Sequence, residues 1–137
     1  MLGAVVSGLR DAEGWSSEKV AADFYDLKGA VEGLLANLGD RLAFQPGVFP
    51  GLHDGQSASI SVDGQVVGRI GTVHPAVCKA MGLPGNTAVA ELLQSAVTQV
   101  AMPAYADISK YPETRRDLAL IVDESIPSGD VLSVVED

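Results

Sequence analysis

The segment Ser57–Val73 (SASISVDGQVVGRIGTV) constrains the fold of this chain more than any other stretch of its sequence. Apolar residues alternate with serines up to Val62, the pair Asp63-Gly64 follows, and a second apolar run begins at Val66. Alternation with a period of two is typical of a half-buried strand, and Asp-Gly between two such runs is typical of a tight hairpin turn. We therefore expect a β-hairpin here. Gly68 and Gly71 in its second strand predict a bulge or the close approach of a neighbouring backbone.

A helix is expected from Asp23 to Leu38. Apolar residues recur there at the spacing of one helical face, namely Leu27, Val31, Leu34, Leu35 and Leu38. Asp23 is suited to the N-cap, Lys28 and Glu32 to an i,i+4 ion pair, and Gly39 to the position just past the end. The interpretation is an amphipathic helix that packs on the sheet formed by the hairpin, with Leu34 and Leu35 both buried.

The remaining pattern completes an α+β fold. Further strands are expected at Met1–Gly8, Arg41–Phe44, Thr87–Leu93 and Arg116–Val122, and helices at Pro75–Met81 and from Ile126 onward. Gln45–Gly55, with its prolines and glycines, predicts an irregular loop, and Ala104–Lys110 an extended segment. The apolar run Leu118–Val122 resembles a buried strand, yet little sequence follows it, so its pairing partner is not evident.

Composition excludes several classes of protein. The 137 residues suffice for one globular core, and no apolar run approaches the roughly 20 residues that span a bilayer. The net charge of −9 repels a polyanion, which argues against nucleic-acid binding by this chain alone. The single cysteine, Cys78, forms no internal disulfide and fits a reducing compartment, so we expect a cytoplasmic location.

Candidate catalytic groups are sparse. His53, Asp54 and His74 suggest an acid–base or metal site, but no third ligand follows at a characteristic spacing. The simpler interpretation is that each histidine forms local hydrogen bonds. Since no nucleophile elbow, P-loop or dinucleotide fingerprint is present, the residues alone predict no catalytic, cofactor-binding or metal site.

Four phrases together resemble the β chain of bacterial phenylalanine–tRNA ligase. Asp23–Gly29 is similar to that family's DFFDLKG segment, and Leu52–Ala58 to its LHPGRSA loop, with Asp54 in place of the usual proline. Gly68–Pro75 resembles the phrase GxIGxLHP, and Tyr111–Ala119 the phrase FPxxxRDLA. The phrases occur in the family's order.

The resemblance implies a fold and a division into domains. Residues 1–105 would be the C-terminal part of a degenerate class II synthetase-like core, an antiparallel sheet flanked by helices. Residues 106–137 would be a linker and the first strand and helix of a truncated ferredoxin-like, anticodon-binding domain. The apolar run Leu118–Val122 would then be a first strand whose remaining sheet is missing.

The resemblance also implies a function. The complete enzyme, a heterotetramer of two α and two β chains, attaches phenylalanine to its tRNA with ATP and magnesium, while this segment supports subunit assembly and leads into the tRNA-binding domain. No catalytic residue is carried onto these positions, and the segment alone is expected to be inactive. The alternative is an independent small acidic binding module or enzyme that uses His53, Asp54 and His74.

Arg115 and Arg116 are the candidate nucleic-acid-binding residues. One interpretation places them on a tRNA-facing surface. The other, which we favour, makes them strand-end charges that pair with Glu113, Asp117 or Asp123, because the acidic chain opposes phosphate contacts.

Overall fold

The computed structural model describes the chain except for residues 13, 16–17, 99–109, 112–113 and 137. It divides into two compact units, Met1–Ala104 and Tyr105–Asp137, which are described separately. The expected extended segment Ala104–Lys110 lies, apart from its last residue, outside the described residues.

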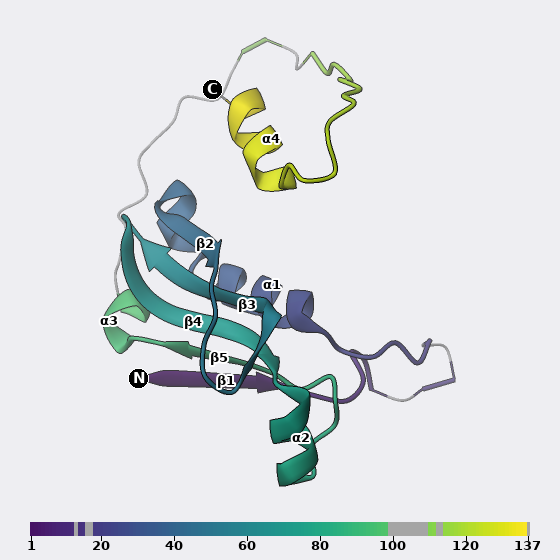
Figure 1. The fold of residues 1–137 in the computed structure, drawn as a ribbon. Coiled ribbons are helices and arrows are strands. Elements are labelled where there is room, and N and C mark those ends of the chain that lie inside the picture. Colours follow the sequence, from purple (N-terminus) through teal and green to yellow (C-terminus); the bar gives the residue numbers. More distant parts are fainter. Residues whose placement is uncertain (13, 16–17, 99–109, 112–113, 137) are drawn as a thin grey trace. The chain divides into compact units, whose positions relative to one another are not determined.

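The first unit is built on a five-stranded antiparallel sheet with the strand order β1-β5-β4-β3-β2 (Figure 1). Its strands are β1 (Leu2–Val6), β2 (Leu42–Pro46), β3 (Leu52–Val62), β4 (Gln65–Val73) and β5 (Ala88–Leu92). Helix α1 (Phe24–Leu34) covers one face of this sheet. Together these elements confirm the predicted α+β class with an antiparallel sheet.

The start of α1 follows the sequence rules closely. The Asp23 carboxylate accepts hydrogen bonds from the backbone N–H groups of Tyr25 and Asp26, while Asp26 accepts one from the N–H of Asp23. This reciprocal capping box satisfies donors that an uncapped helix leaves unpaired. The predicted Lys28–Glu32 ion pair is also present.

The end of α1 differs from the prediction. The α-helix stops at Leu34, and a 3₁₀ segment, Ala36–Arg41, follows it. Gly39, expected just past the helix, lies inside this segment with a φ of 53°, a left-handed conformation that suits glycine. Around this junction Leu35 and Leu38 are buried, whereas Leu34 is half-exposed.

The predicted hairpin is confirmed as β3 and β4, joined at Asp63-Gly64, where both residues have positive φ. Val67 is the extra residue of a bulge, since Ile60 pairs with Gly68 and Ser61 with Val66. The close backbone approach that Gly68 and Gly71 predicted is also confirmed. A Cβ at Gly68 would lie 2.3 Å from the carbonyl oxygen of Glu91 on β5.

Strand β3 begins earlier than predicted. Leu52–Gly55, expected to be irregular, belong to the strand, because Leu52 pairs with Val73 at the far end of β4. The register then shifts before Ser57 resumes the pairing with Gly71. Non-local pairing thus overrides the local turn propensity of this stretch.

Short helices complete the first unit. Helix α2 (Pro75–Met81) has proline at its start, as predicted, and ends at Gly82 in the left-handed conformation. Helix α3 (Gln94–Val97) was not predicted, because four residues are too few to show a period. The buried core joins the inner face of α1 to the central strands.

The loop between β1 and α1 is closed at its base. Leu9 and Ala21 form an isolated antiparallel bridge, and the N–H of Arg10 donates to the carbonyl of Val20 over 2.9 Å. The Asn86 amide donates to the carbonyl oxygens of Gly8 and Ala22, at 2.8 and 3.0 Å. One side chain therefore ties both ends of the loop to the turn before β5.

The second unit contains helix α4 (Ser128–Glu136), which confirms the helix expected after Ile126. The strand predicted at Arg116–Val122 is wrong for the structure, since these residues are described but form no ladder. Leu118 and Val122 are exposed, and Ile121 is fully so. Apolar character alone does not form a strand, because a strand needs a partner for its backbone groups.

Candidate functional site

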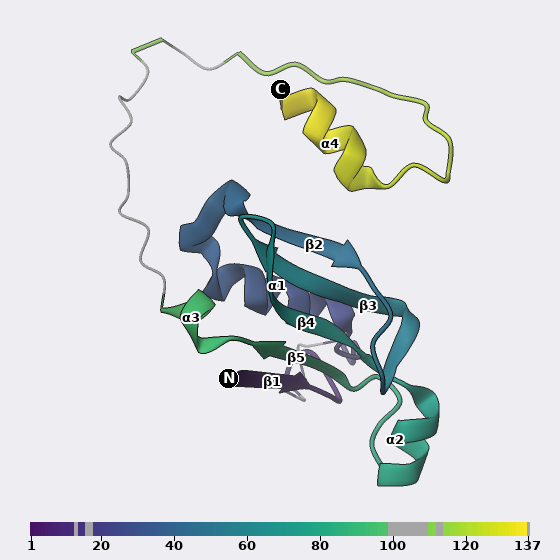
Figure 2. The ribbon, with the colours of Figure 1, turned by 60° about the vertical axis from the view of Figure 1, so that its left-hand side comes forward.

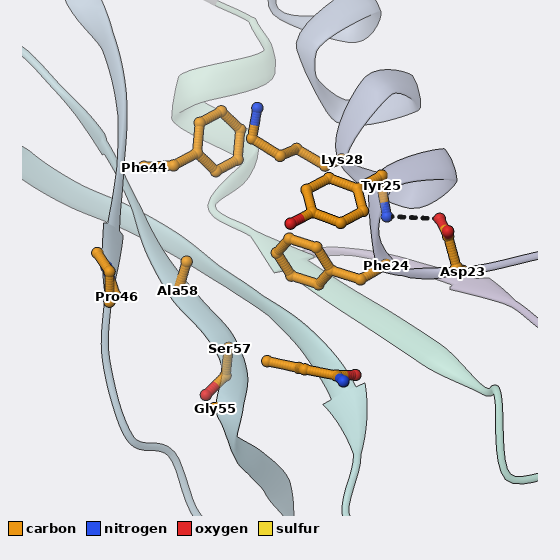
Figure 3. A pocket seen from close by; sticks show the side chains of 10 residues that line it. Asp23, Phe24, Tyr25, Lys28, Phe44, Pro46, Gly55, Ser57 and Ala58 are labelled. Atoms are coloured by element: carbon orange, nitrogen blue, oxygen red, sulfur yellow. Dashed lines mark hydrogen bonds between the residues drawn. The ribbon is translucent and has the colours of Figure 1, made fainter. Parts of the chain in front are cut away.

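A hollow lies at the start of α1, facing β2 and β3 (Figure 3). Its volume is about 560 Å³, within the range of ligand pockets. Ten residues line it: Asp23, Phe24, Tyr25, Lys28, Phe44, Pro46, Gly55, Gln56, Ser57 and Ala58. We call this feature the α1 hollow.

Aromatic rings form its walls. The rings of Phe24 and Tyr25 meet edge to face, with centroids 5.4 Å apart and an interplanar angle of 87°. Phe44 lies across the hollow on β2, and the Lys28 ammonium sits 4.7 Å from its ring centroid. Such walls suit an apolar group, with the Lys28 stem along one side.

The polar groups of the hollow are mostly engaged within the fold. The Ser57 hydroxyl lies 2.6 Å from the carbonyl oxygen of Gly47 and 3.0 Å from that of His53, so its single hydrogen serves loop closure. The Asp23 carboxylate caps α1. Lys28 is paired with Glu32. The hollow therefore offers shape and apolar surface more than reactive groups.

Asp26, in the first turn of α1, binds both the helix start and the loop that precedes it. The backbone N–H of Asp23 lowers the pKa of this carboxyl below its ordinary value of 3.8, and the Arg10 guanidinium, 2.8 Å away, acts in the same direction. Asp26 is therefore ionised throughout the neutral range. This charge holds the incoming loop against the first turn of α1.

The histidines expected as an alternative site each serve a local structure. Nδ1 of His74 accepts the N–H of Ala76 at 3.1 Å and caps α2, and Nδ1 of His53 accepts the N–H of Gly55 at 3.2 Å. Asp54 is exposed on β3. Within the described part of the chain, no group of three or more His, Cys, Asp or Glu residues is placed to hold a metal ion.

The other residues singled out in the sequence are placed as follows. Cys78 is buried and its thiol donates to the carbonyl of Val73 over 3.7 Å, a packing role. Arg115 and Arg116 are exposed in the second unit. Asp123, one expected partner, accepts hydrogen bonds from Ser125, which lower its pKa, and Glu113 lies outside the described residues.

The α1 hollow brings together two of the phrases that carried the family resemblance. Asp23–Gly29 supplies the helical wall and Leu52–Ala58 supplies the strand wall. Both phrases were recognisable in the sequence, but the sequence around each phrase could not show that the two lie side by side in the fold. Phe44 and Pro46 lie outside these phrases, so the sequence did not predict that β2 forms the remaining wall of the hollow.

Fold and hollow together define an α+β domain with an aromatic-walled hollow between the start of α1 and strands β2 and β3. A family model described as "Phenylalanyl tRNA synthetase beta chain CLM domain" matches residues 1–93. The chain thus belongs to the family of phenylalanyl-tRNA synthetase beta chains.

Curated relatives agree with this assignment. The phenylalanine–tRNA ligase beta subunit of Colwellia psychrerythraea is 45% identical over 138 residues, covering 99% of this chain and 17% of the relative. The same subunit of Vibrio cholerae is 44% identical, and the match covers 96% of this chain and 17% of the relative. The subunit of Pseudomonas fluorescens is 42% identical, and the match covers 100% of this chain and 18% of the relative. The chain thus spans about a sixth of the length of these relatives.

Proposed function

We propose that this chain acts as a non-catalytic assembly segment of a phenylalanine–tRNA ligase beta subunit. The observation that carries the proposal is the 45% identity that extends over 99% of the chain. In the complete enzyme, an α subunit would bind phenylalanine, ATP and magnesium. This segment would support the contact between subunits and lead into the tRNA-binding domain.

The finer placement is part of the same proposal. Residues 1–105 would be the C-terminal part of a class II synthetase-like core, and residues 106–137 the start of a ferredoxin-like domain. An unpaired, exposed Leu118–Val122 is consistent with a first strand whose neighbours come from other residues. The assembly would be a cytoplasmic heterotetramer of two α and two β chains. In the described residues, no helix is both long and apolar enough to cross a membrane.

A segment exchange tests the proposal. The matching segment of the Colwellia psychrerythraea beta subunit is replaced by this chain, and the hybrid is produced together with its α subunit. We expect a hybrid that purifies with the α subunit and aminoacylates tRNA. The isolated chain should give no phenylalanine-dependent pyrophosphate exchange.

Two results would contradict it. A hybrid beta subunit that folds but fails to retain the α subunit would remove the assembly role. Pyrophosphate exchange by the isolated chain would show that the segment itself carries chemistry. As a matched control, the relative's own segment is reinserted at the same junctions, so that the effect of cutting and joining is measured separately.

A further inference from the structure

The sequence contains two Asp-Gly pairs, Asp54-Gly55 and Asp63-Gly64, and their surroundings in the fold differ. In an Asp-Gly pair the nitrogen of the glycine can attack the side-chain carboxyl of the aspartate and close a five-membered ring. Glycine favours this reaction because it has no side chain to hinder the nitrogen and leaves the backbone free to bend. The restraint on the backbone and the state of the carboxyl group then decide whether a given pair reacts.

The Asp54-Gly55 pair lies in a gap of the strand pairing. Strand β3 runs between β2 and β4 (Figure 2), but its register with β4 is interrupted between Leu52 and Ser57. Its register with β2 begins only at Ala58. Among the described residues, neither Asp54 nor Gly55 has a partner in either register, and both are exposed. The backbone here is therefore less restrained than in the rest of the strand.

A base is already in contact with the attacking nitrogen of this pair. The N–H of Gly55 donates to Nδ1 of His53 over 3.2 Å, so this ring nitrogen carries no hydrogen and presents a lone pair to the amide proton. A proton acceptor within hydrogen-bond distance of the group that must lose its proton is the geometry of general-base catalysis. His53 is only half-buried, so its proton can exchange with water.

The carboxylate of the second pair is restrained. Nε of Arg41 lies 3.0 Å from both carboxylate oxygens of Asp63, and Nη2 lies 2.5 Å from one of them. These hydrogen bonds lower the pKa of Asp63, so its carboxyl is held in the ionised form, whose oxygen is a poor leaving group. The two pairs thus differ both in backbone restraint and in the state of the carboxyl group.

We propose that Asp54 is a modification site, at which the chain converts aspartate into isoaspartate without an enzyme. The Gly55 nitrogen bonds to Cγ of Asp54, and His53 accepts the amide proton and passes it to the carboxyl hydroxyl, which leaves as water. The product is a succinimide ring. Water then adds at the original backbone carbonyl of Asp54 and breaks its bond to the Gly55 nitrogen, so that the chain continues through Cβ and Cγ. Since one water leaves and one returns, the composition of the chain is unchanged.

The conversion changes a wall of the α1 hollow. It adds Cβ of Asp54 to the backbone of β3 directly before Gly55–Ala58, which line the hollow (Figure 3). The Ser57 hydroxyl, 3.0 Å from the carbonyl oxygen of His53, spans the altered linkage. Ageing of the chain therefore acts on the strand wall of the hollow.

Peptide mapping of the aged chain tests the proposal. The 137-residue chain is kept at neutral pH and body temperature for several weeks, digested, and analysed by mass spectrometry with electron-transfer fragmentation, which distinguishes isoaspartate from aspartate. We expect isoaspartate to accumulate at position 54 while Asp63 stays unchanged. An unmodified Asp54, or conversion of Asp63 at an equal or higher rate, would overturn the proposal.

Two variants, each checked for a native circular dichroism spectrum, separate the causes. His53→Ala removes the base and should slow conversion of Asp54 by about threefold or more, whereas mere loosening of the backbone would accelerate it. An unchanged or faster rate in this variant would overturn the role of His53. Arg41→Gln is the matched test at the other pair, and it should start conversion at Asp63 without altering the rate at Asp54. A still unreactive Asp63 would overturn the protective role of Arg41.

Discussion

Neighbouring leucines at the end of α1 have opposite environments. Leu35 is 1% exposed and belongs to the core, whereas Leu34 is 47% exposed and lines a shallow apolar hollow between α1 and strands β1 and β5. The helical stripe predicted both as buried, because a regular α-helix through Leu38 would keep them on one face. Leu34 lies on the same side of α1 as Leu27 and Val31, and no described residue covers it as fully as the core covers Leu35.

Truncating each leucine separately tests this difference. Leu35→Ala leaves a cavity in a closed core and should lower the free energy of unfolding by about 2 to 5 kcal/mol. Leu34→Ala removes surface that is already half in water, and its cost should stay below about 1 kcal/mol. Urea unfolding of both variants gives the comparison, and equal losses would contradict the assigned burial.

Because Asp26 takes part in the capping box, its ionisation makes the stability of the fold depend on pH. The pKa of Asp26 is lower in the folded chain than its ordinary value of 3.8, so its ionised form stabilises the fold. This contribution is complete above 3.8 and is lost as the pH falls through the lower, folded value. Asp26→Asn should therefore be less stable than wild type at pH 7.

The difference should shrink as the pH falls below 3.8. Thermal unfolding of both proteins from neutral to acidic pH measures it. Glu32→Gln is a useful control, because it also removes a negative charge from α1 but leaves the cap intact. A gap between wild type and Asp26→Asn that stays constant across this range would exclude the cap as its source.

At the scale of elements, local rules predicted those features that depend on neighbouring residues. The cap at Asp23, the turn at Asp63-Gly64 and the proline start of α2 each follow from the conformational preferences of a few residues. Local rules gave wrong predictions where pairing with a distant strand decides whether a segment becomes a strand. Leu52 joins β3 because Val73 lies opposite, while the equally apolar Leu118–Val122 forms no strand.

The candidate site shows the same limit. Its two walls were both recognisable as family-like phrases, but their meeting depends on how α1 crosses the sheet. Phe44, which faces them, carries no motif at all. Sequence reasoning could name pieces of the α1 hollow but not assemble it.

The contact between β4 and β5 makes a prediction at this scale. Gly68→Ala would force a methyl group against the Glu91 carbonyl, so the strands would have to separate, at a cost of about 1 to 3 kcal/mol. Gly29→Ala on α1 meets no atom within 4 Å and should instead stabilise by about 0.5 to 1 kcal/mol. Chemical denaturation of the pair checks the signs, and a stabilising Gly68→Ala would disprove the close approach.

For the whole molecule, charge governs encounters with other macromolecules. Acidic side chains number 18 and basic ones 9, so the long-range field opposes a polyanion. Arg115 and Arg116 are exposed but belong to this acidic chain. We therefore expect both arginines to have a structural role in this chain.

The corresponding prediction is negligible tRNA affinity of the isolated chain at physiological salt. Binding is measured during a salt titration with wild type and with the Arg115→Ala/Arg116→Ala double variant. Both should bind equally weakly, because few phosphates are neutralised by either protein. Tight wild-type binding that disappears in the double variant would assign these arginines to a tRNA-facing surface.

The ties at the base of the loop between β1 and α1 bear on how this domain tolerates additions. Since Asn86 and the Leu9–Ala21 bridge hold the loop ends, these contacts offset part of the entropy of closing the loop. Each doubling of a flexible loop costs only about 0.6 kcal/mol. A reporter domain inserted between the two tied ends of this loop should therefore leave the sheet folded, which makes the loop a suitable position for labelling.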